Sequence, residues 1–193
     1  NKILDINPQH VDSLINIGIA YYELNELDQA LEYLNKAKNL NTREDEVCFI
    51  LGLIFEKNKN LDSAIFNYNE SIKYNSSNTD ALINLGNIYL QNNNYDNAKT
   101  VYEKAIKLKP NDPNLYHSLG VVFTKLNNFE KAIELYSKSK ELNTKNSLTF
   151  YNLGYLLAKN LKFDESIKNY NRALKLDSNN PKFYYNLAMA ETE

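Results

Sequence analysis

The sequence predicts an all-α protein made of repeated antiparallel helix hairpins. Only 5 of its 193 residues are Gly and only 4 are Pro, and so few helix breakers favour long helices. Apolar residues recur three and four apart, as in Leu82, Leu85 and Tyr89, which is the period of a helix with one buried face. Every glycine follows the previous one by 34 residues, and such a fixed period indicates a repeat architecture. The glycines are Gly18, Gly52, Gly86, Gly120 and Gly154.

Other columns follow the same period when each glycine is numbered position 8 of its unit. Position 20 is always small, with Ala30, Ala64, Ala98, Ala132 and Ser166. Position 24 is always large, with Leu34, Tyr68, Tyr102, Tyr136 and Tyr170. Gly and Ala at these places let neighbouring backbones approach closely, so a bulky replacement is expected to overpack a helix contact.

Turn and helix-start signals divide each unit into two helices. A polar turn such as Asn92–Asn94 is followed by a bulky residue at position 17 and an acid at position 18. The N-terminus of a helix favours negative charge, so these acids predict the start of the second helix: Asp28, Asp62, Asp96, Glu130 and Asp164. Proline is favoured at helix boundaries, and the four prolines mark the boundaries of units: Pro8, Pro110, Pro113 and Pro181.

The period gives the expected organisation of the chain as one solenoid fragment. Residues 1–10 match the end of a preceding repeat, and residues 181–193 match the start of a sixth. Between them lie repeats 11–44, 45–78, 79–112, 113–146 and 147–180. Natural solenoids finish with polar capping elements, and neither end of this sequence carries one. We therefore expect exposed apolar ends through which two chains form a homodimer.

The sequence resembles the tetratricopeptide repeat (TPR) family. The segment Ala81–Pro110 carries the family signature most fully, with Leu82, Leu85, Gly86, Tyr89, Ala98, Tyr102, Ala105 and Pro110 in place. Departures are mild: Cys48 takes a bulky position in the second unit, and Ser166 replaces Ala in the fifth. The resemblance implies a right-handed α-α superhelix that acts as a non-catalytic scaffold and binds a peptide or helix of a partner protein in its concave groove.

Charge and composition exclude several classes of function. The formal net charge is −2, which lacks the basic excess that nucleic-acid binding needs. No apolar run approaches the length of a membrane span. A single cysteine, Cys48, suits a reducing compartment, so we expect an intracellular, cytoplasmic protein that binds neither nucleic acid nor membrane.

Catalytic motifs are missing from the sequence. Isolated glycines cannot form a phosphate-binding loop. His10 and His117 are far apart, and with one cysteine they leave no plausible zinc ligand set. The column of Cys48 predicts a buried thiol, without the access that a nucleophile needs. We expect no enzyme activity, no cofactor and no metal site.

Position 6 of the first helices is rich in asparagine. It reads Asn16, Ile50, Asn84, Ser118, Asn152 and Asn186, whereas 32 Asn in the whole chain predict about one in six places. A row of side-chain amides can hydrogen-bond the backbone of an extended peptide. The row is similar to the asparagine ladder of O-linked N-acetylglucosamine transferases, although Ile50 and Ser118 interrupt it. The alternative is that a genome rich in A and T overuses Asn.

Positions 5 and 9 add apolar and aromatic residues to the same face. Exposed apolar surface in a groove usually marks a partner site, and Tyr151, Tyr155 and Tyr185 form an aromatic patch. The alternative is that these tyrosines pack on further repeats. The predicted groove residues are Asn16, Asn84, Asn87, His117, Ser118, Tyr151, Asn152, Tyr155, Tyr185 and Asn186.

Two other functions stay open at this point. One alternative to the peptide-binding scaffold is the substrate-recruiting arm of a larger enzyme, such as an O-linked N-acetylglucosamine transferase, and the other is an architectural subunit of a large assembly. The fold by itself cannot choose between them.

Overall fold

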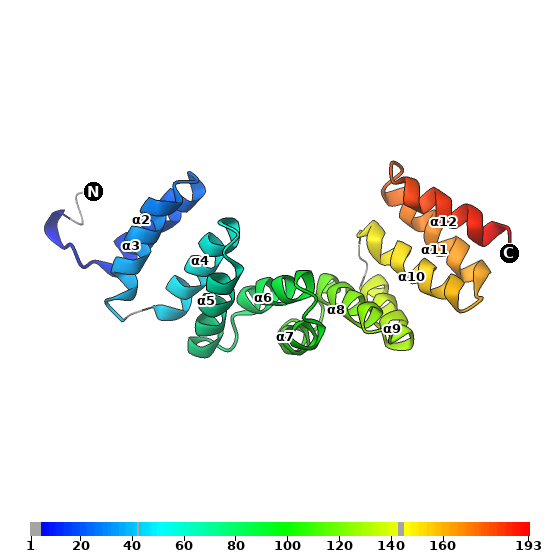
Figure 1. Cartoon of the computed structure of the whole chain (residues 1–193), viewed down its shortest axis with the longest axis horizontal. Helices are drawn as coiled ribbons and strands as arrows, with labels where there is room; N and C mark the ends of the chain where they lie inside the picture. Colours follow the sequence, from blue (N-terminus) through cyan, green and yellow to red (C-terminus); the bar gives the residue numbers. More distant parts are fainter. Residues whose placement is uncertain (1–4, 42, 143–144) are drawn as a thin grey trace. The chain divides into compact units, whose positions relative to one another are not determined.

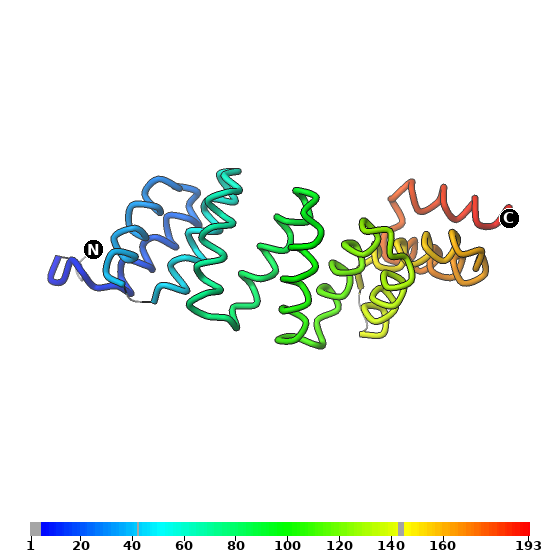
Figure 2. Tube along the Cα trace, turned by 60° about the horizontal axis from the view of Figure 1, so that its bottom comes forward, coloured from blue at the N-terminus to red at the C-terminus, as the bar shows by residue number. Residues whose placement is uncertain are grey.

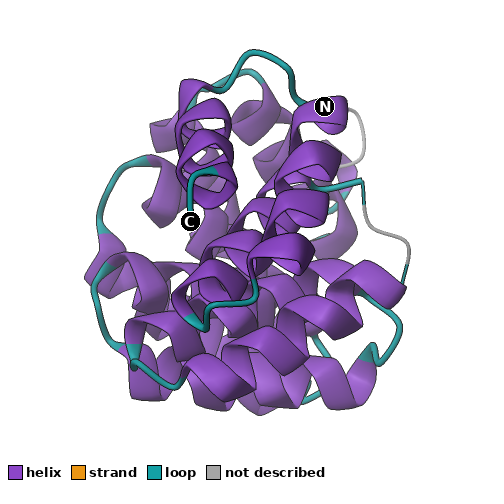
Figure 3. Ribbon diagram, turned by 90° about the vertical axis from the view of Figure 1, so that its right-hand side faces the viewer, coloured by secondary structure: helices purple, strands orange, loops and turns teal. Residues whose placement is uncertain are grey.

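The computed structural model describes residues 5–41, 43–142 and 145–193, in which the chain forms helices and loops (Figures 1 and 3). The helices, in order, are α2 (Val11–Glu23), α3 (Leu27–Lys38), α4 (Glu44–Lys57), α5 (Leu61–Tyr74), α6 (Thr79–Gln91), α7 (Tyr95–Leu108), α8 (Pro113–Lys125), α9 (Phe129–Glu141), α10 (Ser147–Lys159), α11 (Phe163–Leu176) and α12 (Pro181–Glu191).

The helices fall into two compact units, residues 1–92 and 93–193. In the first unit, α2 pairs with α3 and α4 with α5, while α3 packs on α4 and α5 packs on α6. In the second unit, α8 pairs with α9 and α10 with α11, and the packing continues from α7 to α8, α9 to α10 and α11 to α12. Figure 2 follows these hairpins along the chain trace. We call α2, α4, α6, α8, α10 and α12 the A helices, and the remaining five the B helices.

Each B helix begins where the sequence analysis placed it. The first residues are Leu27, Leu61, Tyr95, Phe129 and Phe163, and an acid lies in the first turn of each helix. Pro113 and Pro181 occupy the first turns of α8 and α12, where the missing proline N–H costs no hydrogen bond. The predicted start signals are therefore confirmed.

Many asparagines that the sequence analysis assigned to genome composition cap helices. The Oδ1 atom of Asn78 accepts a hydrogen bond from the N–H of Ala81 at 3.0 Å, and Asn60 accepts one from Ser63 at 3.2 Å. The same role falls to Asn128, Asn146 and Asn180. A capping side chain of this kind stabilises a helix by about 1 kcal/mol, so part of the asparagine enrichment has a structural cause.

Position 15, in the turn between the A and B helices, adopts the left-handed conformation. Its φ angles lie between 58° and 63° in Asn25, Lys59, Asn93, Asn127 and Leu161. Asparagine tolerates this conformation better than other residues with a Cβ atom, which explains its presence in three of the five turns. Lys59 and Leu161 are the two exceptions, and Leu161 is 76% exposed.

We predict that Leu161→Asn stabilises the protein. The change relieves the strain of a left-handed backbone conformation, and little packing is lost because Leu161 is mostly exposed. We expect the free energy of unfolding to rise by about 0.5–1 kcal/mol. Urea unfolding followed by circular dichroism measures it. Leu24→Asn is the matched control, because Leu24 is also exposed, at 67%, but has an ordinary φ of −74°. Equal effects of the two changes would contradict the prediction.

The repeated glycine faces the large side chain at position 24. A Cβ atom added to Gly52 would lie 2.5 Å from Cε1 of Tyr68, and one added to Gly120 would lie 2.8 Å from Cε1 of Tyr136. The corresponding distance from Gly18 to Cγ of Leu34 is 2.6 Å. At these three glycines the contacts correct the sequence analysis, which expected glycine to make room for a neighbouring backbone, because a side chain of the same repeat fills the space. At Gly154 the expected backbone approach is also present, since a Cβ atom would lie 3.2 Å from the carbonyl oxygen of Ser166.

Serines in the small columns hydrogen-bond buried carbonyl groups. Ser71 donates its hydroxyl to the carbonyl oxygen of Asp45 at 2.7 Å, and Ser139 donates to that of Pro113 at 2.8 Å. Ser166, which replaces the usual alanine at position 20, donates to the carbonyl oxygen of Gly154 at 2.8 Å. The hydroxyl groups of these serines therefore have hydrogen-bond partners inside the core. Cys48 is also buried, as its column predicts.

Candidate functional site

Two small pockets open on the A helices of the second unit, and Tyr155 of α10 lines both of them. We call them the first and second Tyr155 pockets. Each has a volume of about 230 Å³. The first is lined by Val121, Thr124, Lys125, Tyr136, Tyr151, Asn152 and Tyr155. The second is lined by Tyr155, Ala158, Lys159, Phe163, Tyr170, Asn186, Met189, Ala190 and Glu193.

Aromatic packing holds the tyrosines of these pockets in place. The ring of Tyr151 stacks on Phe183 with centroids 4.9 Å apart and lies 5.8 Å from the ring of Tyr170. Tyr155 keeps 37% of its surface exposed, and Nζ of Lys159 lies 5.1 Å from its ring centroid. Tyr151 is thus fixed as a wall, while Tyr155 presents a ring to solvent beside a positive charge.

A chain of hydrogen bonds runs through the first Tyr155 pocket. Nδ2 of Asn152 donates to the hydroxyl oxygen of Tyr136 at 3.3 Å. Oγ1 of Thr124 donates to the carbonyl oxygen of Gly120 at 2.9 Å and lies 3.3 Å from the Tyr136 hydroxyl. Because the single Thr124 hydrogen goes to Gly120, Tyr136 donates its own hydrogen to Thr124.

The first unit repeats this arrangement with a stronger acceptor. Nδ2 of Asn84 donates to the hydroxyl oxygen of Tyr68 at 3.3 Å, and that hydroxyl donates to Oε2 of Glu56 at 2.6 Å. Burial raises the pKa of the Tyr68 hydroxyl, and the Glu56 carboxylate raises it further. Burial also raises the pKa of Tyr136 to about 12. Both hydroxyls therefore stay protonated and able to donate.

These bonds relate position 6 to position 24 of the preceding repeat. Each buried tyrosine hydroxyl needs a partner, and Asn84, Ser118 and Asn152 bond Tyr68, Tyr102 and Tyr136. Ile50 interrupts the asparagine row where the preceding repeat has Leu34, which carries no hydroxyl. The row therefore has a structural role that the sequence analysis missed, although the pairing of the two columns was visible in the sequence.

We predict a coupling energy of about 0.5–1.5 kcal/mol between Asn152 and Tyr136, because the bond joins two partly buried polar groups. A double-mutant cycle of Asn152→Ala and Tyr136→Phe, read from urea unfolding, measures it. The control cycle combines Asn171→Ala with Tyr136→Phe. Asn171 is exposed on α11, so we expect no coupling energy in this cycle. Additive effects of Asn152→Ala and Tyr136→Phe would show that the bond contributes nothing.

The imidazole of His117 packs against Thr149 and Tyr136 and is not a free surface group. Its Nδ1 atom lies 2.8 Å from Oγ1 of Thr149, and its ring centroid lies 5.5 Å from that of Tyr136. Burial lowers the pKa of His117 to about 4. The imidazole is therefore neutral at neutral pH and carries no charge onto the A-helix face.

We predict that acid destabilises the protein partly through His117. The pKa of this residue is lower in the folded chain than its ordinary value of 6.5, so the unfolded chain binds more protons between these values. Stability is fully present above pH 6.5 and falls by up to about 3 kcal/mol as the pH approaches 4. Melting temperatures of the parent and of His117→Gln between pH 4.5 and 7.5 test this. Parallel curves would contradict it.

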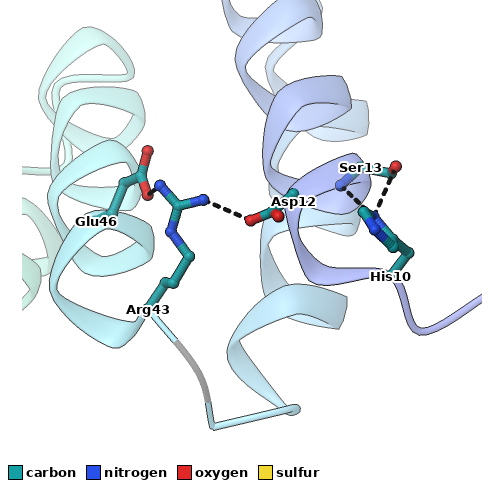
Figure 4. Close-up of polar contacts among 5 residues, drawn as sticks. All are labelled: His10, Asp12, Ser13, Arg43 and Glu46. Carbon is teal, nitrogen blue, oxygen red and sulfur yellow. Dashed lines mark hydrogen bonds and ion pairs between the residues drawn. The ribbon is translucent and has the colours of Figure 1, made fainter.

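The A helices of the first unit carry more acidic groups. In Figure 4, Arg43 lies between Asp12 of α2 and Glu46 of α4 and pairs with both, with 2.5 Å between its Nη1 atom and Oδ1 of Asp12. Asn16 is exposed and lines a cavity of about 600 Å³ beside Tyr21 and Tyr33, whose rings stack at 5.5 Å. Asn84 lines a separate cavity of about 370 Å³ with Tyr22, Leu53, Glu56 and Lys57.

The structure brings together some of the predicted groove residues. Tyr151, Asn152 and Tyr155 share the first Tyr155 pocket, and Asn186 joins Tyr155 in the second. Tyr185 is 66% exposed and lies outside both, and Asn87 is half-buried in α6. The predicted groove residues did not include Val121, Thr124, Lys125, Lys159 and Met189, which also line the pockets. Their positions 9, 12 and 13 share one helix face with positions 5 and 6, but this spacing by itself does not show which residues of the face enclose a pocket.

Across residues 5–41, 43–142 and 145–193, no three or more His, Cys, Asp or Glu side chains gather in a group that could hold a metal ion. Within these ranges, each helix is also too short or too polar to span a membrane.

Comparison with protein families gives two matching models. A model described as tetratricopeptide repeat matches residues 11–43, 45–78 and 113–146. A second model, described as TPR repeat, matches residues 86–126 and 162–190. No curated protein matches the chain in sequence.

Several solved structures share the fold at low sequence identity. YrrB, described as a TPR protein with an unusual peptide-binding site, is 17% identical with a TM-score of 0.82, over 100% of this chain and 97% of that one. MamA from Desulfovibrio magneticus RS-1 is 18% identical with a TM-score of 0.78, over 89% and 97% of the two chains. A chain of the APC/C hetero-tetramer Cut9-Hcn1 is 22% identical with a TM-score of 0.68, over 100% of this chain and 38% of that one. The predicted all-α solenoid of helix hairpins is confirmed.

Proposed function

Because the chain belongs to the tetratricopeptide repeat family, we propose that its A helices bind an extended peptide segment of a partner protein. The fold itself supports a protein–protein interaction scaffold. The finer proposal rests on one observation: the two Tyr155 pockets open side by side on the face that carries Asn152 and Asn186. Apolar pockets beside fixed amides suit a peptide, since side chains fill the pockets and the backbone meets the amides.

Asn152 has hydrogen-bonding capacity left for such a backbone. An asparagine amide offers two donors and one acceptor, and Asn152 is half-buried with one donor directed at Tyr136. Asn186 directs its Nδ2 atom to the Tyr151 hydroxyl at 2.8 Å and to the carbonyl oxygen of Lys182 at 3.1 Å. These internal bonds orient the amides, and a preorganised group loses less conformational entropy on binding.

The structural likeness to YrrB, whose description includes a peptide-binding site, supports the same proposal. The predicted groove residues of the first unit, Asn16, Asn84 and Asn87, belong to the proposal as further contacts. His117 and Ser118 act mainly through packing and hydrogen bonds within the fold.

The two alternative functions would use different surfaces for binding. An architectural subunit would use the B helices or the face of α12, where Tyr184, Tyr185 and Met189 are exposed, and homodimers through that face remain a prediction. A recruiting arm of a glycosyltransferase would depend on the asparagine row. That row has a structural cause in the tyrosine hydroxyls, so no observation favours the enzyme arm over a simple scaffold.

We predict that peptides selected on this chain from a random phage-displayed library bind at the Tyr155 pockets. Tyr155→Ala removes an exposed aromatic ring shared by both pockets, and a central aromatic contact commonly contributes about 2 kcal/mol. The dissociation constant of the selected peptides is therefore expected to rise at least about tenfold. Isothermal titration calorimetry measures it.

Two control variants separate binding from folding. Phe66→Ala removes an aromatic side chain that is 58% exposed on a B helix, and it should leave affinity unchanged. Tyr136→Phe removes the internal bond to Asn152 but keeps the amide, so it should cost less affinity than Asn152→Ala. If Phe66→Ala abolishes binding and Tyr155→Ala does not, the A-helix proposal is wrong and the architectural alternative stands.

A further inference from the structure

We infer that the peptide accepted by the Tyr155 pockets carries two apolar or aromatic side chains next to acidic residues. This inference rests on the proposed function and names the chemistry of the partner at the same site. It follows from three properties of the second unit: the size of the pockets, their lining, and the charge beside them.

The size of each pocket fits one side chain. A volume of about 230 Å³ lies below the range of about 300–1,000 Å³ typical of small-molecule sites. Two separate pockets that share Tyr155 as a common wall therefore suit two side chains projecting from one face of an extended segment. Such side chains are two residues apart in a β-strand and three apart in a polyproline II helix.

The lining of each pocket is mainly apolar. Val121 and Tyr151 line the first pocket, while Phe163 and Met189 line the second. Methionine and aromatic side chains adapt well to apolar or aromatic ligands. Met189 is 48% exposed and Tyr155 is 37% exposed, so a bound apolar side chain would remove apolar surface on both partners from water.

The first pocket has a positive charge that no acid in its lining offsets. Lys125 lines the first pocket and Lys159 lines the second. In the described part of the chain neither lysine pairs with a carboxylate, and Nζ of Lys159 lies over the rings of Phe129 and Tyr155 at 5.0 and 5.1 Å. The acid in the lining is Glu193 of the second pocket. A carboxylate on the peptide would therefore meet Lys125 beside the first pocket, whose lining contains no acid, and this favours an acidic residue in the partner at that place.

The first unit also has a lysine at this repeat position, but there an acid lines the same cavity. Lys57 lies 4.7 Å from the ring centroid of Tyr22 and donates to the carbonyl oxygen of that residue at 3.4 Å. Its cavity is also lined by the carboxylate of Glu56. The lysine of the first unit is thus held by Tyr22 and offset by an acid, unlike Lys125, so the preference for acidic peptides belongs to the first Tyr155 pocket.

Three sets of fluorescent peptides test the inference against the full chain by fluorescence anisotropy. The first set has two Phe flanking Asp residues, with the Phe two or three residues apart. The second set replaces the Asp residues by Lys, and the third replaces the two Phe by Ser. At an ionic strength of about 0.15 M, where distant charges are screened, a peptide of the first set is expected to bind at least about tenfold more tightly than its counterparts.

A charge reversal adds a readout that general damage to the fold would not produce. Lys125→Glu combined with Lys159→Glu is expected to reverse the preference, so that the Lys peptides bind more tightly than the Asp peptides. Lys57→Glu is the matched control in the first unit and should leave the preference unchanged. Circular dichroism verifies that each variant keeps its helices.

The outcomes distinguish this inference from the proposed function. If Asp and Lys peptides bind equally well and Tyr155→Ala abolishes both, the acidic preference is wrong while peptide binding at the A helices stands. If binding survives Tyr155→Ala, both are wrong. Binding by none of the Phe peptides, or an unchanged preference after charge reversal, overturns the inference.

Discussion

The packing of one large side chain against one glycine in the hairpins α2–α3, α4–α5, α8–α9 and α10–α11 is the constraint on which the rest of this structure depends. The rings of Tyr68 and Tyr136 lie so close to Gly52 and Gly120 that a Cβ atom would clash with them. Both tyrosines are at most 1% exposed, so their hydroxyls cannot rely on water. A buried hydroxyl without a partner costs about 1–3 kcal/mol, and the A helices must therefore supply polar groups to it.

That requirement links the core to the face proposed for binding. Asn152 and Asn84 serve the tyrosine hydroxyls with one donor each, so the same amides stabilise the fold and are oriented for a ligand. The two units then differ in what surrounds the amides. The carboxylate of Glu56 and a lysine held on Tyr22 accompany Asn84, whereas the exposed ring of Tyr155 and the lysine Lys125 accompany Asn152. One repeat pattern can therefore present different chemistry along a single chain.

Most of the fold was predictable because its signals are local and repeated. The acids after each turn marked the starts of the B helices, Pro113 and Pro181 marked the starts of A helices, and a single period set the register of every column. The candidate site was predictable only in part. Tyr151, Asn152 and Tyr155 were identified from helical spacing, but the exposed Tyr185 does not line the pockets, and Val121 and Lys125 do. Helical spacing tells which residues share a face, and neighbouring helices decide which of them enclose a space.

The sequence by itself determined the hairpin architecture, the length of the repeat, the burial of Cys48 and the positions that must stay small. These properties follow from periodicity and from the conformational limits of glycine and proline, which act within one repeat. Only the tertiary structure decided what glycine makes room for, why Ile50 interrupts the asparagine row and which lysines remain without an acidic partner. Those properties depend on contacts between helices, within one repeat for glycine and between successive repeats for Ile50, where the distances separating individual side-chain atoms determine the packing, the hydrogen bonds and the charge pairs that form.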